Sequence, residues 1–372
     1  MNQKEQRILH LIQENPFITQ NELAEKLELS RPAVANYIST LTKKGKLVGR
    51  AYILPKEKHI TCIGGANVDR KAQVIGSAQY GTSNPVTSFK STGGVARNIA
   101  ENLGRLESSV SLLTLLGEDS EGEWLLEKSK PYIDMSLIYK IPNSNTGAYT
   151  AVIDSDGEMV IALSEMSIID QMEVSHVQKR WGRIAGSDLI LMDTNLPPEV
   201  IEHIIKQSYI KNIPVCIASV SSPKINKIPE DCTGVTWLIL NRDEAETLTG
   251  IPLNEENNYK KATDIMIAKG IENIVITLGE QGVFYATNKG ESEYILPPEI
   301  HVQDVTGAGD SLIAGIVYAT LQGEDIQTAC KYGMSCSAIT LQTNETVHSG
   351  LNKKVLHEGY TTYFEGEDQH ET

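Results

Sequence analysis

Four consecutive residues, Gly307, Ala308, Gly309 and Asp310, have the types and spacing to bind an anion and accept a proton. They lie in "DVTGAGDSLIAG", at the start of an apolar segment that predicts a helix. Backbone N–H groups of small residues at a helix N-terminus bind anions. A carboxylate beside them can take the proton of an attacking hydroxyl while the amides stabilise a transferred phosphoryl group. The alternative is that Asp310 only caps the helix, which leaves the two glycines unexplained.

The elements that must position these residues alternate between strand and helix from Ile60 onward. "SDLILMDTNLP", "IPVCIASVS" and "WLILN" read as buried strands, and "PEVIEHIIKQS" and "KATDIMIAKG" read as helices. This alternation predicts an α/β domain with a largely parallel central sheet flanked by helices. Ligands on such sheets bind beyond the carboxyl ends of the strands, where the polar clusters of this chain fall. Nothing matches the GxxxxGK[ST] pattern of a Walker A loop.

One segment, residues 147–163, breaks the alternation. In "GAYTAVIDSDGEMVIAL", Asp156-Gly157 separates two runs in which apolar residues recur at every second position. This pattern predicts a β-hairpin. A hairpin that projects from an α/β body is either a lid or an extension of the sheet edge, and we favour the lid.

Four segments resemble the PfkB, or ribokinase-like, family of carbohydrate and nucleoside kinases. "VTGAGDSLIAG" resembles its C-terminal signature and "STGGVARNIAENLGRL" its N-terminal signature. "LNRDEAETLTG" matches the family's Asn-x-x-Glu segment, and "ITLGEQGV" matches its Thr-x-Gly-x-x-Gly nucleotide segment. The four follow in the family's order within residues 60–345, so the resemblance implies a ribokinase-like fold with a β lid.

The resemblance implies a role for each matching residue. It makes Asp310 the catalytic base and Gly307–Gly309 the anion hole. It assigns substrate hydroxyls to Asn67, Asp69, Gly93, Gly94 and Asn98, ATP to Asn241, Thr277, Gly279 and Gly282, and Mg²⁺ to Glu244.

Most of these residues also have a purely structural alternative. Asn67 and Asp69 are common turn formers, and Gly93-Gly94 is compatible with a tight turn. Asn241 and Glu244 are spaced as a helix cap and a first-turn acid. These alternatives stay open at the level of sequence.

Within the family, "SNPVTSFKSTGGVARNIAENL", "ALSEM" and "MDTNL" resemble the pseudouridine kinase branch. This implies an ATP-dependent, Mg²⁺-requiring kinase that phosphorylates the 5′-hydroxyl of a ribonucleoside, above all pseudouridine. Ala218-Ser219 stands where relatives commonly carry Asp-Pro, which leaves the acceptor open. The alternatives are another sugar or purine-nucleoside kinase, and a transcriptional regulator that uses the kinase fold as a ligand sensor. A monovalent cation near Asp304 and Thr306 also stays open, and we expect a homodimer.

The first 54 residues predict three short helices followed by a two-stranded hairpin that turns at Gly49-Arg50. This pattern resembles a bacterial winged helix-turn-helix, whose third helix enters the major groove of DNA. The alternative is a module used only for dimerisation or docking. The DNA-contacting residues would be Ser30, Arg31, Asn36 and Tyr37 on the third helix and Arg50 in the wing.

The distribution of charge agrees with this division. The chain has 372 residues and a net charge of −15, yet residues 1–58 carry +4 and the remainder −19. An acidic body repels a phosphate backbone, so nucleic acid should meet the first segment. Five scattered cysteines and the lack of a signal peptide or a long apolar run favour the cytoplasm and no membrane contact. We therefore expect a DNA-binding domain (1–54), a linker (55–59), a kinase domain (60–362) and an acidic tail (363–372).

Overall fold

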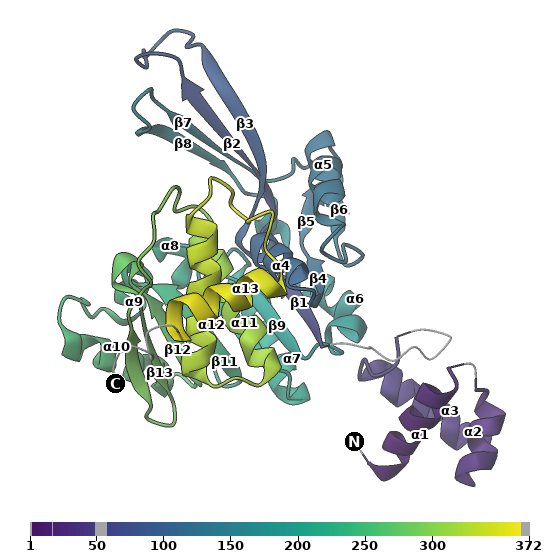
Figure 1. Cartoon of the computed structure of the whole chain (residues 1–372). Helices are drawn as coiled ribbons and strands as arrows, with labels where there is room; N and C mark the ends of the chain where they lie inside the picture. Colours follow the sequence, from purple (N-terminus) through teal and green to yellow (C-terminus); the bar gives the residue numbers. More distant parts are fainter. Residues whose placement is uncertain (1, 17, 49–57, 366–372) are drawn as a thin grey trace.

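A computed structural model of the chain describes residues 2–16, 18–48 and 58–365, and an eight-stranded sheet forms the centre of its larger part (Figure 1). The strands are parallel except β13 and β14, which add antiparallel at one edge. Across the sheet they are β14 (Ser292–Ile295), β13 (Val283–Thr287), β12 (Asn273–Thr277), β11 (Val235–Asn241), β10 (Val215–Ala218), β9 (Leu189–Asp193), β1 (His59–Ile63) and β4 (Ser109–Leu113). The predicted α/β class is therefore confirmed, and β1 begins at His59, inside the expected linker.

Helices cover both faces of this sheet because its central strands are buried on both sides, as in β9 and β10. One apolar core lies beneath α6 (Val174–Ile184), α7 (Pro198–Lys211), α9 (Arg242–Thr249) and α10 (Glu256–Ala268). The other lies beneath α4 (Val95–Arg105), α5 (Ser120–Ser129), α11 (Ala308–Gln322) and α12 (Ile326–Leu341). Smaller elements are β5 (Leu115–Gly117), β6 (Tyr139–Ile141), α8 (Ser222–Ile225), α13 (Lys353–Tyr360), the 3-10 turns Ile169–Gln171 and Gly279–Gln281, and a π turn at Thr361–Glu365.

A second sheet, in the order β3-β2-β7-β8, projects from the body (Figure 1). The predicted hairpin supplies β7 (Ala148–Ile153) and β8 (Met159–Glu165), with Gly157 at a φ of +88° in the turn. The sequence analysis missed the other half, β2 (Asn67–Val74) and β3 (Val86–Gly93). We call this four-stranded sheet the lid. The sequences of β2 and β3 do not indicate a buried face, because most of their side chains are exposed or half-buried.

The three N-terminal helices are confirmed as α1 (Gln3–Glu14), α2 (Gln20–Leu27) and α3 (Arg31–Lys43). Thr19 and Glu22 form a capping box at the start of α2, and Ser30 caps α3. Ile8, Leu23, Val34 and their neighbours form a separate apolar core. Residues 46–48 form no strand, and the rest of the expected wing, including Arg50, lies outside the described residues.

None of the described helices is both long and apolar enough to span a lipid bilayer. All five cysteines lie buried and unpaired in the described residues, so the expectation of no disulfide framework agrees with the structure. The last part of the expected acidic tail, residues 366–372, lies outside the described residues.

Candidate active site

The candidate site lies at the carboxyl ends of the central strands, where a parallel sheet binds ligands. Asp193, the last residue of β9, is buried there and joins three segments of the chain. Its carboxylate accepts hydrogen bonds from the backbone amides of Gly65 (2.8 Å), Ala96 (3.0 Å) and Asn195 (2.9 Å). Burial raises the pKa of Asp193, and these three amides oppose the rise. Asp193 therefore fixes the start of α4 against the end of β1.

Gly307 begins α11 in the left-handed conformation, at a φ of +81°. A Cβ on Gly307 would lie 1.9 Å from the carbonyl oxygen of Thr346, so no other residue fits this close approach. No side chain caps the helix. The amide of Ala308 makes a 3.3 Å bond to the carbonyl of Val305, and the amides of the first turn otherwise face a helix end without intrahelical partners. Amides at such a helix N-terminus can bind an anion, which is the role expected of them.

Asp310 lies in the first turn of α11 but does not cap it, because the N-cap residue is Gly307. The capping interpretation of Asp310 is therefore wrong. Its Oδ2 accepts a 2.7 Å bond from Nδ2 of Asn98 on α4. Removal from water, chiefly, together with the negative charges of Asp193 and Asp69, raises the pKa of Asp310 to about 7. A carboxylate with this pKa can act as a base near neutral pH.

Asn67 and Asp69 lie at the start of β2, within a strand, so the turn interpretation of these two residues is wrong. Nδ2 of Asn67 donates to Oδ1 of Asp69 over 2.6 Å, and burial raises the pKa of Asp69. Gly93, at the end of β3, pairs with Asn67, and a Cβ there would lie 2.3 Å from Oδ2 of Asp69. Gly94 has a φ of +97°, and a Cβ on it would meet the carbonyl of Gly65 at 2.5 Å. Gly93 is therefore needed for close packing around Asp69, and Gly94 for close packing against Gly65 and Ala66.

Asn241 and Glu244 form a capping box at the start of α9, as the structural alternative anticipates. The side chain of Asn241 accepts from the amide of Glu244 (2.9 Å), and Oε2 of Glu244 accepts from the amide of Asn241 (2.7 Å). Ser219, where the sequence departs from its relatives, also donates its hydroxyl to Oε2 of Glu244. Glu244 is buried, so the box holds the carboxylate in one orientation.

Thr277, Gly279 and Gly282 line a cavity of about 870 Å³ that reaches Ala308 and Gly309 at the start of α11. Gly279 and Gly282 have positive φ values of +60° and +87°. Thr277 pairs with Asn241 across the neighbouring strands β12 and β11. Apolar side chains form much of the remaining wall, among them Ile300, Val302, Val305, Leu312, Met334 and Leu341. A wall of this kind suits the flat apolar face of the nucleobase of a nucleotide whose phosphates lie toward α11.

Asp304 and Thr306, where the resemblance leaves a monovalent cation open, are hydrogen-bonded to each other. Oδ1 of Asp304 accepts from the amide (2.8 Å) and the hydroxyl (2.6 Å) of Thr306. Oδ2 accepts from Nζ of Lys71, on the lid strand β2, over 2.7 Å. Although partial burial opposes them, these bonds lower the pKa of Asp304 to about 2. The carboxylate therefore already has a cationic partner, the Lys71 ammonium, which ties the lid to the segment before α11.

Within residues 2–16, 18–48 and 58–365, no three His, Cys, Asp or Glu side chains cluster closely enough to hold a metal ion. Glu244 offers one buried carboxylate close to the carboxyl end of β11. Its Oε2 already accepts hydrogen bonds from the amide of Asn241 and the hydroxyl of Ser219. A single oxygen donor fits Mg²⁺ only when phosphate oxygens and water complete its octahedron.

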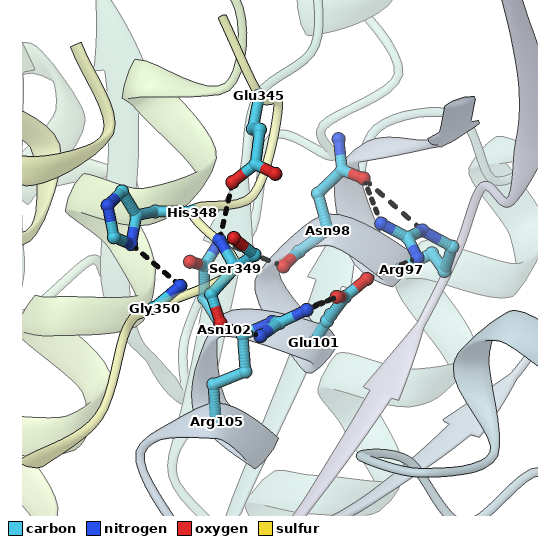
Figure 2. Close-up of polar contacts among 9 residues, drawn as sticks. All are labelled: Arg97, Asn98, Glu101, Asn102, Arg105, Glu345, His348, Ser349 and Gly350. Atoms are coloured by element: carbon cyan, nitrogen blue, oxygen red, sulfur yellow. Dashed lines mark hydrogen bonds and ion pairs between the residues drawn. The ribbon is translucent and has the colours of Figure 1, made fainter. Parts of the chain in front are cut away.

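The sequence analysis assigned no role to Arg97, Glu101 or Asp193. Arg97 and Glu101 lie one and three residues from Asn98 on α4 and are joined by an ion pair of 2.6 Å (Figure 2). Arg97 and Asp193 are completely buried. All three occur in segments that the sequence analysis quoted, and the signal that marks them is a charged residue inside an otherwise apolar or small-residue segment.

In the N-terminal segment, Arg31 and Asn36 are exposed on α3. Ser30 is also exposed, and its hydroxyl accepts the cap bond from the amide of Ala33 over 3.4 Å. Tyr37 is half-buried and packs against the core of the three helices, so it is not a free surface residue.

Comparisons with known proteins match both parts of the chain. Residues 57–354 match the pfkB family of carbohydrate kinases, and residues 1–48 match a winged helix-turn-helix DNA-binding family. The uncharacterized sugar kinase YeiI of Escherichia coli (strain K12) is 29% identical over 91% of this chain and 94% of its own length. Pseudouridine kinase of the same organism is 31% identical over 80% of this chain and 95% of its own length.

Solved structures agree with the fold. A carbohydrate kinase from Agrobacterium tumefaciens superposes with a TM-score of 0.72 at 28% identity, covering 82% of this chain and 97% of its own. Ribokinase of Arabidopsis thaliana, solved with ribose and ATP, gives a TM-score of 0.71 at 17% identity, covering 82% of this chain and 99% of its own. The second likeness shows the fold alone.

Proposed function

The chain belongs to the pfkB family of carbohydrate kinases, an ATP-dependent family of sugar and nucleoside kinases, and on that premise we propose that it phosphorylates the 5′-hydroxyl of a ribonucleoside, with pseudouridine as the preferred acceptor. The observation that carries the proposal is the position of Asp310. Its carboxylate lies in the first turn of α11, beside Ala308 and Gly309, which line the cavity of Thr277 and Gly279, and close enough to Asp69 of β2 for the charge of Asp69 to act on it. A base between a nucleotide cavity and a diol-binding carboxylate is what phosphoryl transfer to an alcohol requires.

The residues of the chain divide the reaction between them. Asp69 and Asn67 bind and orient the acceptor's ring hydroxyls, since a carboxylate and an amide match paired hydroxyl donors and acceptors. Asp310 takes the proton of the attacking hydroxyl, and the first-turn amides of α11 stabilise charge on the transferred group. ATP would bind in the cavity of about 870 Å³, and Glu244 would be the protein's ligand to a Mg²⁺ held mainly by the phosphates, which would neutralise their charge.

The lid supports a nucleoside over a small sugar as the acceptor. Tyr149 of β7 is the direct strand partner of Asp69, so the two side chains share one face of the lid. Phe89 of β3 pairs with Lys71, two residues from Asp69, and lies on the same face. This face points toward the body, because Lys71 reaches Asp304 from it. Two aromatic rings beside the hydroxyl-binding residues give a nucleobase surfaces to stack on.

The test is turnover of a panel of acceptors by the purified full-length chain with ATP and Mg²⁺, followed by ADP formation. The panel contains pseudouridine, uridine, inosine, guanosine, ribose and fructose. We expect the highest kcat/KM with pseudouridine and a product with phosphate on the 5′-oxygen. Turnover of ribose or fructose without turnover of any nucleoside would contradict the proposal, and ADP formation with no acceptor would count as hydrolysis.

A second candidate function, DNA binding, is favoured by the N-terminal segment. Arg31 and Asn36 are exposed on α3, the helix that enters the major groove in the matched family, and residues 1–58 carry +4 on a chain of net −15. The two functions are compatible, since a kinase with such a segment could report the presence of its nucleoside to a promoter.

We also propose a homodimer, and the outer face of the lid supports it. Met159, Ile161 and Leu163 alternate along β8 and are 58%, 50% and 55% exposed. Ile161 and Leu163 lie on the face opposite Asp69 and Lys71, because Ile161 pairs with Val152 and Leu163 with Thr150. An apolar stripe of this kind fits the same stripe on a second copy of the chain.

A further inference from the structure

Arg97 is a completely buried arginine on α4, one residue before Asn98 (Figure 2). A buried guanidinium is costly unless every side of it is paired and hydrogen-bonded. Burial lowers the pKa of Arg97, and the charge of Glu101 opposes that change. The hydrogen-bond partners of Arg97 therefore indicate the role of its buried charge.

Two of those contacts go to the side chain of Asn98. Nη2 and Nε of Arg97 donate to Oδ1 of Asn98 over 2.7 and 3.2 Å. An arginine has only donors, so it can accept nothing from the amide and must face its oxygen. The nitrogen end of Asn98 is thereby aimed at Asp310, whose Oδ2 it meets at 2.7 Å.

The rest of Arg97 is anchored away from the site. Its Nη1 pairs with Oε2 of Glu101 at 2.6 Å, and Oε1 of Glu101 accepts from Nε of Arg105 at 2.9 Å. Nη1 of Arg105 donates to the carbonyl of Ser349 at 2.6 Å. Figure 2 shows this row of side chains running from the 345–350 segment along α4 to Asn98.

We propose that Arg97 is a positioning residue for phosphoryl transfer, which orients Asn98 so that its amide donates to the carboxylate of Asp310 and which places a positive charge beside that base. The proposal rests on the proposed function, in which Asp310 is the base. It also gives Asn98 a further role, because its oxygen accepts from Arg97 and its nitrogen donates to the carboxylate of Asp310.

The charges around Asp310 make this role measurable. Asp193 on β9 and Asp69 on β2 raise the pKa of Asp310, whereas the Asn98 bond and the charge of Arg97 on α4 lower it. Loss of Arg97 removes its charge and frees the Asn98 amide to turn. The base should then bind its proton more tightly, with its pKa higher by about one unit, in the range that a nearby charge or hydrogen bond supplies.

The first measurement needs no substrate. In the full chain labelled with ¹³C at aspartate carboxyls, the Asp310 signal is assigned by its loss in Asp310→Asn and then titrated. We expect the Asp310 pKa to rise by about one unit in Arg97→Met and in Asn98→Leu, and by less in Arg97→Lys, which keeps the charge. Arg183→Met, which removes a surface arginine paired with Asp134, is the matched control and should leave the titration unchanged.

The second measurement is the pH profile of kcat with whichever acceptor the wild-type chain phosphorylates best. The acid limb should move upward with the titration, which leaves about tenfold less activity below pH 7, while the KM for ATP stays within about twofold. If Arg97→Met fails to fold by circular dichroism, Arg97→Lys and Asn98→Leu carry the test. An unmoved carboxyl titration in the folded variants would overturn the proposal. A wild-type chain without kinase activity would overturn only the proposed function.

Discussion

The pKa of Asp310 connects the chemistry of the site to the stability of the chain. Desolvation and two neighbouring acids hold this pKa at about 7, against about 4 for an aspartate in an unfolded chain. A raised pKa favours the protonated form in the folded state. Its contribution to stability is therefore complete below pH 4 and is lost as the pH rises through 7. The ionised carboxylate, which the proposed reaction needs, is therefore the form of Asp310 that makes the folded state less stable.

This opposition predicts opposite effects of Asp310→Asn on activity and on stability. We expect kcat to fall by at least about 10³-fold, because the variant cannot accept the proton. We expect its melting temperature to exceed that of the wild type at pH 8 and the difference to shrink at pH 5, where the wild-type carboxyl is protonated. Differential scanning fluorimetry at both pH values checks the second effect. Near-normal turnover by Asp310→Asn would show that another group is the base.

Site residues could be predicted from the sequence where their role depends only on neighbouring residues in the chain. Gly307 and Asp310 could be recognised because a helix start, a positive φ and an anion site all depend on adjacent residues. Asp193 could not, because the amides of Gly65 and Ala96 that it binds come from segments far along the chain. Arg97 bonds to near neighbours on its own helix, but its complete burial depends on the packing of the whole domain. The half-burial of Tyr37 depends in the same way on packing, since its ring lies against the core of the three helices.

Among the elements, the lid was half predicted. The β7–β8 hairpin has alternating apolar residues and an Asp-Gly turn, whereas in β2, "NVDRKAQV", Arg70 interrupts the apolar face. Its side chains instead make specific contacts, with Asp69 bonded to Asn67 and Lys71 bonded to Asp304. A strand selected for such contacts does not show the alternation by which strands are recognised.

The inner face of the lid gives a test of the nucleoside acceptor. Tyr149→Ala should raise the KM for pseudouridine by about tenfold or more, because stacking on an aromatic side chain contributes about 1–3 kcal/mol per base. The KM for ATP should not change. Thr150→Ala, the next residue on the opposite face, is the matched control. An equal rise in the KM for pseudouridine in both variants would indicate general damage to the lid instead of a contact between Tyr149 and the nucleobase.

The outer face predicts the oligomeric state. Ile161→Glu places a charge in the centre of the apolar stripe, so it should convert a dimer into a chain of 40.8 kDa. Light scattering after size-exclusion chromatography measures this mass. Ile210→Glu, at a residue of α7 that is 65% exposed, is the control and should stay dimeric. A wild-type mass of one chain would remove the dimer proposal.

For the whole molecule, the separation of charge limits how the chain can approach DNA. Residues from 59 onward carry −19, so the body is repelled by a phosphate backbone and only the N-terminal segment can approach it. The helix-turn-helix core is self-contained, with Ile8, Leu23 and Val34 packed among themselves. The phosphate contacts to DNA should therefore come from this segment alone, and salt should weaken binding in proportion to their number.

A titration of salt against affinity tests this arrangement. We expect the full chain to bind DNA from upstream of its own gene more tightly than random DNA of the same length, with log K falling linearly as log salt rises. Arg31→Ala removes an exposed cation at the first position of α3 and should reduce that slope by about one. Arg183→Ala, on the surface of the acidic body, should leave the slope unchanged. Binding that does not respond to salt, or that is absent, would favour the docking role, because a helix that reads the major groove cannot avoid the phosphates on either side of it.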